Sequence, residues 1–197
     1  ITTRALSNYF SEITGIDIDE VALEYARGHG TADNIRYLNM DAMNTDFGDG
    51  SFDIIICNQM YEHVPDPVRL FAEIRRLLSA RGVCYFGATS RLKIIETHYG
   101  RIPFLSYLPK SAANLYLKIL GKGDEYYETL FSYWGLRKLV SGFEISDYTL
   151  NIIRDPEKYS AEDLIGYGHL RSKAASLLAL CAYKLLPGYV WLLKKKG

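Results

Sequence analysis

Short apolar runs alternate with amphipathic segments along the first ninety residues of the chain. The run FDIIIC at residues 52–57 is apolar apart from Asp53, a pattern typical of a strand covered on both faces of a sheet. Expected strands cover residues 13–17, 35–40, 52–57 and 83–88, and expected helices cover residues 1–10, 19–28 and 67–80. Strands that alternate with helices of this length predict an α/β fold with a doubly wound, mostly parallel sheet of the Rossmann-like kind.

The alternation stops in residues 91–132, which are rich in Tyr, Leu and Pro. We expect a single domain over residues 1–197 in which residues 91–132 are an inserted cap over the site. The pattern then predicts a helix at 131–140, a strand at 144–150, a helical stretch from Ser160 toward Leu186, and a last strand from Tyr189.

The apolar stretch 174–193 approaches the length of a membrane span, but Lys184 and Pro187-Gly188 interrupt it. An amphipathic helix followed by a strand explains it as well. Peripheral membrane contact through this helix and the basic tail Lys194–Lys196 is the lesser alternative.

Composition narrows the class of protein. The 197 residues are 48% hydrophobic, enough to bury a substantial core, and 23 basic side chains balance 23 acidic ones. This balance argues against a nucleic-acid partner, which needs a basic surplus. Cys57, Cys84 and Cys181 are far apart and lack metal-ligand spacing, so we expect buried thiols, no metal site and a cytoplasmic location.

Polar residues follow three of the expected strands, at the sheet edge where α/β proteins bind ligands. Asp17 could accept hydrogen bonds from the two hydroxyls of a ribose, although it could also be a helix-capping residue. Asp41 could accept a hydrogen bond from the exocyclic amine of an adenine ring, and the backbone N–H of Ala42 could donate one to a ring nitrogen. The alternative, which spacing alone favours, is that Asp41 is an ordinary solvated aspartate in a loop.

Residues 58–63 (NQMYEH) place two amides, a carboxylate and an imidazole after the third strand. His63 could take a proton from a substrate hydroxyl, because imidazole titrates near neutral pH. The alternative is a structural histidine that bonds to the loop backbone or to Glu62. His98 in the expected cap is the second candidate base.

The runs ITGIDIDEVALEYAR and NIRYLNMDAMNTDFGDGSFDIIICNQMYEHVPDPVRLFAEIRRLLSARGVCYFGATS make the chain similar, over residues 1–90, to class I S-adenosylmethionine-dependent methyltransferases of the type 11 group. The resemblance implies S-adenosylmethionine as cofactor, S-adenosylhomocysteine as product, and the strand order 3-2-1-4-5-7-6. It also implies a set of cofactor-binding residues: Asp17 on the ribose, Ile18 on the adenine ring, Asp41 and Ala42 at the adenine edge, and Asn58 and Gln59 beside the methionine part.

The chain departs from this family at its start. Such enzymes carry a first strand and a Gly-rich loop immediately before the helix at residues 1–10, and the sequence contains neither. We therefore expect an N-terminally truncated piece of a longer enzyme. The missing strand would lie between residues 13–17 and 52–57, so its absence would expose two apolar strand edges.

The sequence therefore predicts methyl transfer to an O, N or C nucleophile of a small molecule by in-line displacement. His63 or His98 would serve as base for a hydroxyl or an acidic carbon. The aromatic cap suits an apolar, lipid-linked or glycan-linked acceptor. The rival interpretations are a non-catalytic Rossmann-like binding or assembly module and an NAD(P)-dependent oxidoreductase. The sequence does not indicate which oligomeric state the protein adopts.

Overall fold

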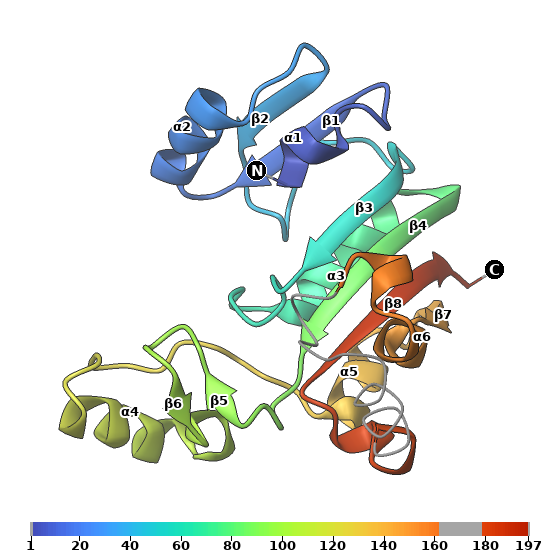
Figure 1. Cartoon of the computed structure of the whole chain (residues 1–197). Coiled ribbons are helices and arrows are strands. Elements are labelled where there is room, and N and C mark those ends of the chain that lie inside the picture. The colour runs from blue at the N-terminus through green and yellow to red at the C-terminus, as the bar shows by residue number, and fades with distance from the viewer. Residues whose placement is uncertain (1, 162–178, 197) are drawn as a thin grey trace.

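The structure, a computed structural model, describes residues 2–161 and 179–196. Its strands form two main sheets (Figure 1). In the smaller sheet β1 (Ile13–Asp17) pairs in parallel with β2 (Ile35–Asn39). In the larger sheet the strands follow the order β3-β4-β8-β7.

The larger sheet is parallel on one side and antiparallel on the other. β3 (Phe52–Asn58) runs parallel to β4 (Leu78–Thr89), and β8 (Gly188–Lys195) lies antiparallel between β4 and β7 (Phe143–Asp147). The order β2-β1 followed by β3-β4-β8-β7 matches the predicted order 3-2-1-4-5-7-6 with strand 1 left out. Among the described residues no strand pairs with the edge of β1 opposite β2 or with the edge of β3 opposite β4.

The helices of the first half begin at well-formed caps. The Asp19 side chain accepts the N–H of Val21 at the start of α2 (Glu20–His29), as the sequence predicts. Asp66 does the same for α3 (Pro67–Leu77), which also has Pro at its first position. α3 ends three residues earlier than expected, because residue 78 already pairs with Phe52 and starts β4.

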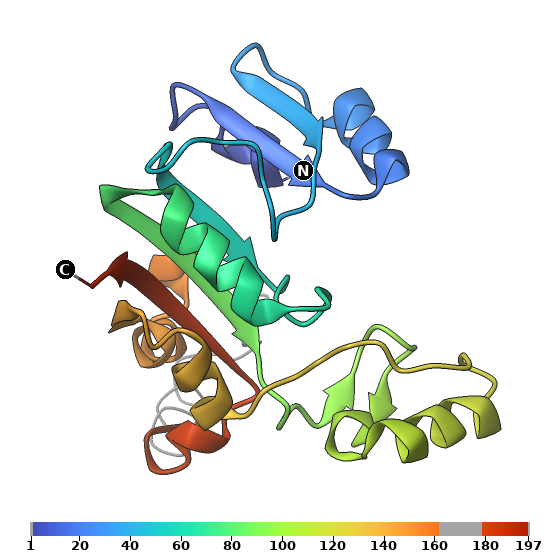
Figure 2. The same cartoon turned by 180° about the vertical axis from the view of Figure 1, so that it is seen from behind.

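One face of the larger sheet carries the main core. α3 and α5 (Tyr133–Leu139) pack against it (Figure 2). Phe71 of α3 makes edge-on contacts with Phe86 and Phe143 at ring distances of 4.9 and 6.1 Å. Each fully buried aromatic side chain of this kind contributes about 1.5–3 kcal/mol to stability. The core residues are Cys57, Tyr61, Leu70, Phe71, Ile74, Leu78, Cys84, Phe86, Ala88, Leu136, Val140, Phe143, Tyr189, Trp191 and Leu193.

The other face of β3 is open, which corrects the expectation of a strand covered on both faces. Ile55 packs against the core, whereas Ile54 and Ile56 point to the opposite face and are 46% and 45% exposed. The apolar run predicts a strand covered on both faces, whereas the exposure of Ile54 and Ile56 shows that the described residues leave this second face partly open.

Residues 91–132 form a small layer of their own at the carboxyl end of β4 (Figure 1). It contains the hairpin β5 (Ile95–Glu96) and β6 (Ile102–Pro103), the 3-10 turn η1 (Leu105–Tyr107) and α4 (Lys110–Ile119). Tyr126 belongs to the core of this layer and Tyr99 packs against it, so part of its aromatic content stabilises the layer itself.

The last part of the chain differs from the prediction in three details. The expected strand 144–150 is β7 followed by a short helix, α6 (Thr149–Arg154), and a 3-10 turn, η2 (Glu157–Tyr159). Most of the helix expected from Ser160 toward Leu186 lies outside the described residues, and near its expected end the chain forms the 3-10 turn η3 (Tyr183–Leu185) instead. Cys181 is exposed, so the expectation of a buried thiol is wrong there.

α1 (Thr2–Leu6) is shorter than the helix expected at residues 1–10. Among the described helices, none is both long and apolar enough to span a membrane.

Candidate functional site

The carboxyl ends of β1, β2 and β3 point toward the same side of the molecule (Figure 1). Asp17 is the last residue of β1, and its exposed carboxylate accepts the N–H of Asp19 through Oδ1 at 3.0 Å. Among the described residues, no group donates a hydrogen bond to Oδ2 of Asp17. The Ile18 side chain is 74% exposed, and the Ile18 carbonyl accepts a bond from Asn39 at the end of β2. This bond ties the two strand ends together.

Asp41 and Ala42 form the turn that follows β2. Oδ1 of Asp41 accepts the N–H of Met43 at 2.8 Å, and the Asp41 carbonyl accepts the N–H of Asn44. Ala42 packs against the main core, and no hydrogen bond of its N–H appears among the described residues. The turn thus offers a carboxylate acceptor beside an available backbone donor.

Asn58 and Gln59 lie at the end of β3, and both are exposed. The side-chain oxygen of Asn58 lies so close to Gly87 of β4 that a Cβ at position 87 would collide with it. Gln59 has a positive φ of 49° and donates its N–H to the Gly87 carbonyl at 2.8 Å. Glycine at position 87 therefore permits the close approach that holds this loop.

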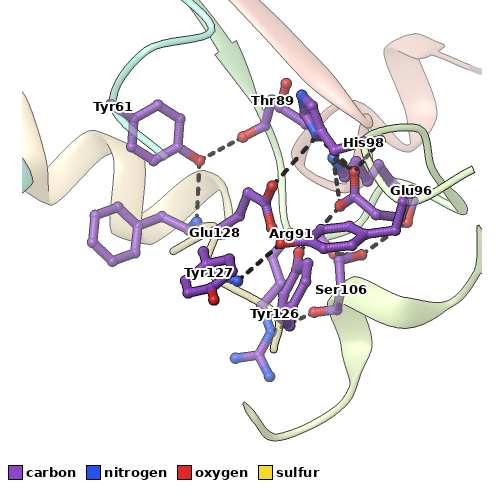
Figure 3. Close-up of polar contacts among 12 residues, drawn as sticks. Tyr61, Thr89, Arg91, Glu96, His98, Ser106, Tyr126, Tyr127 and Glu128 are labelled. Atoms are coloured by element: carbon purple, nitrogen blue, oxygen red, sulfur yellow. Dashed lines mark hydrogen bonds and ion pairs between the residues drawn. The ribbon is translucent and has the colours of Figure 1, made fainter. Parts of the chain in front are cut away.

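Tyr61 anchors the next part of the loop. Its buried hydroxyl donates to the Thr89 carbonyl at 2.5 Å and accepts the N–H of Phe131 at 3.2 Å (Figure 3). Burial raises the pKa of Tyr61, so it remains a neutral donor. One side chain thus joins the loop after β3, the end of β4 and the segment that leads into α5.

Glu62, the next residue, is 1% exposed, and among the described residues neither of its carboxylate oxygens has a hydrogen-bond partner within normal bonding distance. Burial raises the pKa of this carboxyl, and its own backbone N–H, the nearby Thr89 hydroxyl and the charges of His63 and Lys93 oppose the rise without cancelling it. Burying a carboxyl group without partners is costly, so this position carries a destabilising group beside the candidate site.

A second buried carboxylate, Glu96 in β5, is fully paired (Figure 3). Lys93 and the Nδ1 of His98 lie 2.7 and 2.8 Å from it, and the Tyr126 hydroxyl donates to it at 3.1 Å. Burial alone would raise the pKa of Glu96, but the hydrogen bonds and charge of Lys93, together with the bonds from His98, lower it overall. The carboxylate is therefore ionised.

The two candidate bases come together across this network. The rings of His63 and His98 meet edge to face, with centroids 5.0 Å apart, although 35 residues separate them in sequence. Glu128 approaches the same ring nitrogen of His98 as Glu96 does, with Oε1 at 3.8 Å from Nδ1. No hydrogen bond of the His63 ring appears among the described residues, so the structural alternative for His63 finds no support there.

Sequence reasoning did not single out Lys93 and Glu128. Lys93 and Glu96 carry opposite charges and lie three residues apart in the otherwise apolar run LKIIE. This pattern indicates a buried ion pair, and the structure contains it. Glu128 has no comparable signal in the sequence around it.

Among the described residues, no cluster of His, Cys, Asp or Glu side chains is arranged to hold a metal ion. A hollow lined by Asp49, Ala72, Arg75, Arg76 and Lys195 lies near the start of β4, away from every candidate residue.

Residues 1–86 match the family described as a methyltransferase domain. The chain is 34% identical over 95 residues to a ubiquinone biosynthesis O-methyltransferase of Methylococcus capsulatus, covering 46% of this chain and 40% of that protein. It is 32% identical over 126 residues to the enzyme of the same name from Actinobacillus pleuropneumoniae, covering 56% of this chain and 51% of that protein. The chain thus spans about half the length of these curated relatives or less.

Solved structures show the same fold. A SAM-dependent methyltransferase of Thermotoga maritima, described as a possible histamine N-methyltransferase, superimposes with a TM-score of 0.52 at 22% identity, covering 92% of this chain and 72% of that one. Together with the sheet order, this likeness establishes the class I methyltransferase fold.

Proposed function

We propose that this chain, whose residues 1–86 belong to the methyltransferase-domain family, transfers a methyl group from S-adenosylmethionine to a small-molecule acceptor. One observation carries the proposal. Within the matched residues, successive strand ends present an open carboxylate, an adenine-type acceptor and donor, and two exposed amides, in the order that such a cofactor requires.

Each part of the cofactor finds a fitting group. Asp17 has a free carboxylate oxygen for the ribose hydroxyls, and the exposed Ile18 side chain offers an apolar surface for the adenine ring. Asp41 and the N–H of Ala42 suit the adenine edge. Asn58 and Gln59, exposed at the end of β3, would contact the methionine part.

S-adenosylmethionine supplies a methyl group on a positively charged sulfur, which is already an activated electrophile. The main task of the protein is therefore to hold the acceptor atom in line with that methyl group. His63 and His98 provide an imidazole pair at the edge of the site that can accept a proton from an acceptor hydroxyl.

The acceptor in this proposal is a ring or chain hydroxyl of a small, largely apolar molecule. Two observations support it: the relatives are O-methyltransferases of ubiquinone biosynthesis, and the layer formed by residues 91–132 exposes Tyr107 and Tyr127. More specifically, we propose that this acceptor is linked to a lipid or to a glycan. The free, buried thiols of Cys57 and Cys84 suit a reducing compartment, so we propose a cytoplasmic enzyme.

We also propose that a further parallel strand, from polypeptide outside these 197 residues, pairs with the facing edges of β1 and β3. The support is the strand order, in which these edges have no described partner, and the exposed Ile54 and Ile56 beside one of them. Such a strand would join the two sheets into one.

Calorimetric titration with S-adenosylhomocysteine tests the proposed function on the full-length native protein. Asp17→Asn should weaken binding at least about 10-fold, because a charged hydrogen bond contributes about 1.5–3 kcal/mol. Asp19→Asn is the matched control: it alters a carboxylate two residues away, keeps a good helix cap, and should leave the affinity unchanged.

The rival interpretations give different results in the same titration. A protein that binds neither S-adenosylhomocysteine nor NADH would be an assembly module. Binding of NADH alone would indicate an oxidoreductase.

A further inference from the structure

We propose that Glu96 is a positioning residue: it holds the His98 ring with the proton on Nδ1, so that Nε2 stays free to accept a proton from the methyl acceptor. This inference rests on the proposed function and adds to it. It selects His98 from the two candidate bases, and it assigns a role to a buried carboxylate in the layer formed by residues 91–132.

The hydrogen bonds of Glu96 decide which ring nitrogen carries the proton. The carboxylate is fully buried and accepts from the ammonium group of Lys93, the backbone N–H of His98 and the hydroxyl of Tyr126. These donors hold it ionised, and an ionised carboxylate has no proton to donate. The Nδ1 of His98, 2.8 Å from Oε1, must therefore be the donor. A neutral imidazole has one N–H, so the lone pair is on Nε2.

Burial places the two edges of the ring in different surroundings. The Glu96 side chain is fully buried, whereas the His98 side chain is 35% exposed. The ring thus lies at the boundary of the buried network: Nδ1 is bonded to the buried carboxylate, and the side chain as a whole is partly accessible. Figure 3 shows Glu96 and Glu128 beside the His98 ring.

Charged and titratable groups lie on more than one side of the His98 ring. Glu96 and Glu128 approach Nδ1 at 2.8 and 3.8 Å. Lys93 lies behind Glu96 and is paired with it, and the ring of His63 meets His98 edge-on. Glu96 thus holds Nδ1 of His98 in the way that the buried carboxylate of a hydrolase triad holds its histidine in one tautomer and orientation.

The position of His98 suits a proton acceptor. It lies between β5 and β6, and it meets His63, which follows β3 in the loop that starts with Asn58 and Gln59. Residues from the layer 91–132 and from the candidate cofactor loop therefore meet at the two histidines.

The step balances without a further reactant. Nε2 of His98 takes the proton of the acceptor hydroxyl while the oxygen electron pair forms the bond to the methyl carbon. The electron pair of the broken carbon–sulfur bond goes to sulfur. The imidazolium then releases its proton to solvent through its exposed edge.

Nitrogen-15 NMR of the imidazole rings tests the orientation directly in the full-length protein, at a pH where His98 is neutral, with the His98 signals assigned from a His98→Asn variant. We expect the proton of wild-type His98 on Nδ1. The double variant Lys93→Met/Glu96→Leu removes the buried pair without leaving a lone charge, and we expect it to lose this preference. Glu128→Gln is the matched control, because Glu128 makes no hydrogen bond to the ring, and it should keep the preference.

Turnover tests the positioning role, measured as methyl transfer from labelled S-adenosylmethionine to the probe catechol 3,4-dihydroxybenzoate. His98→Ala should lower kcat at least about 100-fold, the usual contribution of a general base, and added imidazole should restore part of the rate. The double variant should lower kcat at least about 10-fold with KM and affinity for S-adenosylhomocysteine unchanged.

Two results would overturn the inference: wild-type His98 protonated on Nε2, or a double variant with wild-type kcat. Failure of the proposed function is distinguishable from these, because it would appear as absent S-adenosylhomocysteine binding and absent methyl transfer while the NMR signals still report on the Glu96–His98 pair.

Discussion

Glu62 makes the stability of the protein depend on pH in a direction that can be worked out from its surroundings. The carboxyl is 1% exposed and has no hydrogen-bond partner in the part of the chain that the structure describes, and burial raises its pKa in the folded state above the ordinary value of 4.5. The folded protein therefore holds this proton more tightly than the unfolded chain. As the pH rises above 4.5, the unfolded chain loses the proton first, and the free energy of unfolding falls until the folded pKa is passed.

Glu62→Gln removes the charge while keeping the shape of the side chain. Each pH unit by which the folded pKa exceeds the unfolded one corresponds to about 1.4 kcal/mol. An unpaired buried polar group costs about 1–3 kcal/mol. We therefore expect the variant to be more stable than the wild type by about 1–2 kcal/mol at pH 8 and equally stable at pH 4.

Urea denaturation at intervals from pH 4 to pH 8 measures this difference. Glu157→Gln is the matched control, because its carboxylate is exposed in η2, and it should give a flat difference near zero. A Glu62→Gln variant whose advantage does not grow with pH, or which is less stable than the wild type at pH 8, would refute the reasoning.

Three further predictions concern stability. Asp66→Ala should cost about 1 kcal/mol in urea denaturation, because its carboxylate accepts two N–H groups at the start of α3, and an unchanged midpoint would contradict the capping role. Phe71→Ala should cost about 3–5 kcal/mol by the same measurement, since it leaves a cavity between α3 and the sheet; a loss under 1 kcal/mol would contradict that packing. Hydrogen bonds from Arg76 lower the pKa of Glu73 from 4.5 to about 2, so the wild type should lose its stability advantage over Glu73→Gln as the pH falls from 4.5 toward 2; an advantage that persists at pH 2 would contradict the pairing.

The sequence predicts most of the sheet because local patterns determine it. Apolar runs bounded by turn residues mark β1, β2, β3 and β8, and the capping position of Asp19 is correct. The pattern does not show where α3 gives way to β4, since that boundary depends on pairing between Phe52 and Leu78. Nor does it show that Ile54 is exposed, because burial depends on what covers the sheet.

The candidate site is less visible in the sequence than the sheet. Residues that follow strands, such as Asp17 and Asp41, can be predicted because parallel strands end at one edge. The network around His98 joins residues 93–98 with residues 126–128, and only the folded chain brings these segments together. Local spacing reveals the pair of Lys93 and Glu96 but not the tertiary contact with Glu128.

The most direct test of the central claim is hydrogen exchange of the full-length native protein, measured by mass spectrometry with and without S-adenosylhomocysteine. If the cofactor binds across the strand ends, amide exchange should slow at residues 17–19, 40–43 and 58–63, and these changes should vanish in Asp17→Asn. Unchanged exchange in all three segments at saturating S-adenosylhomocysteine would contradict the account.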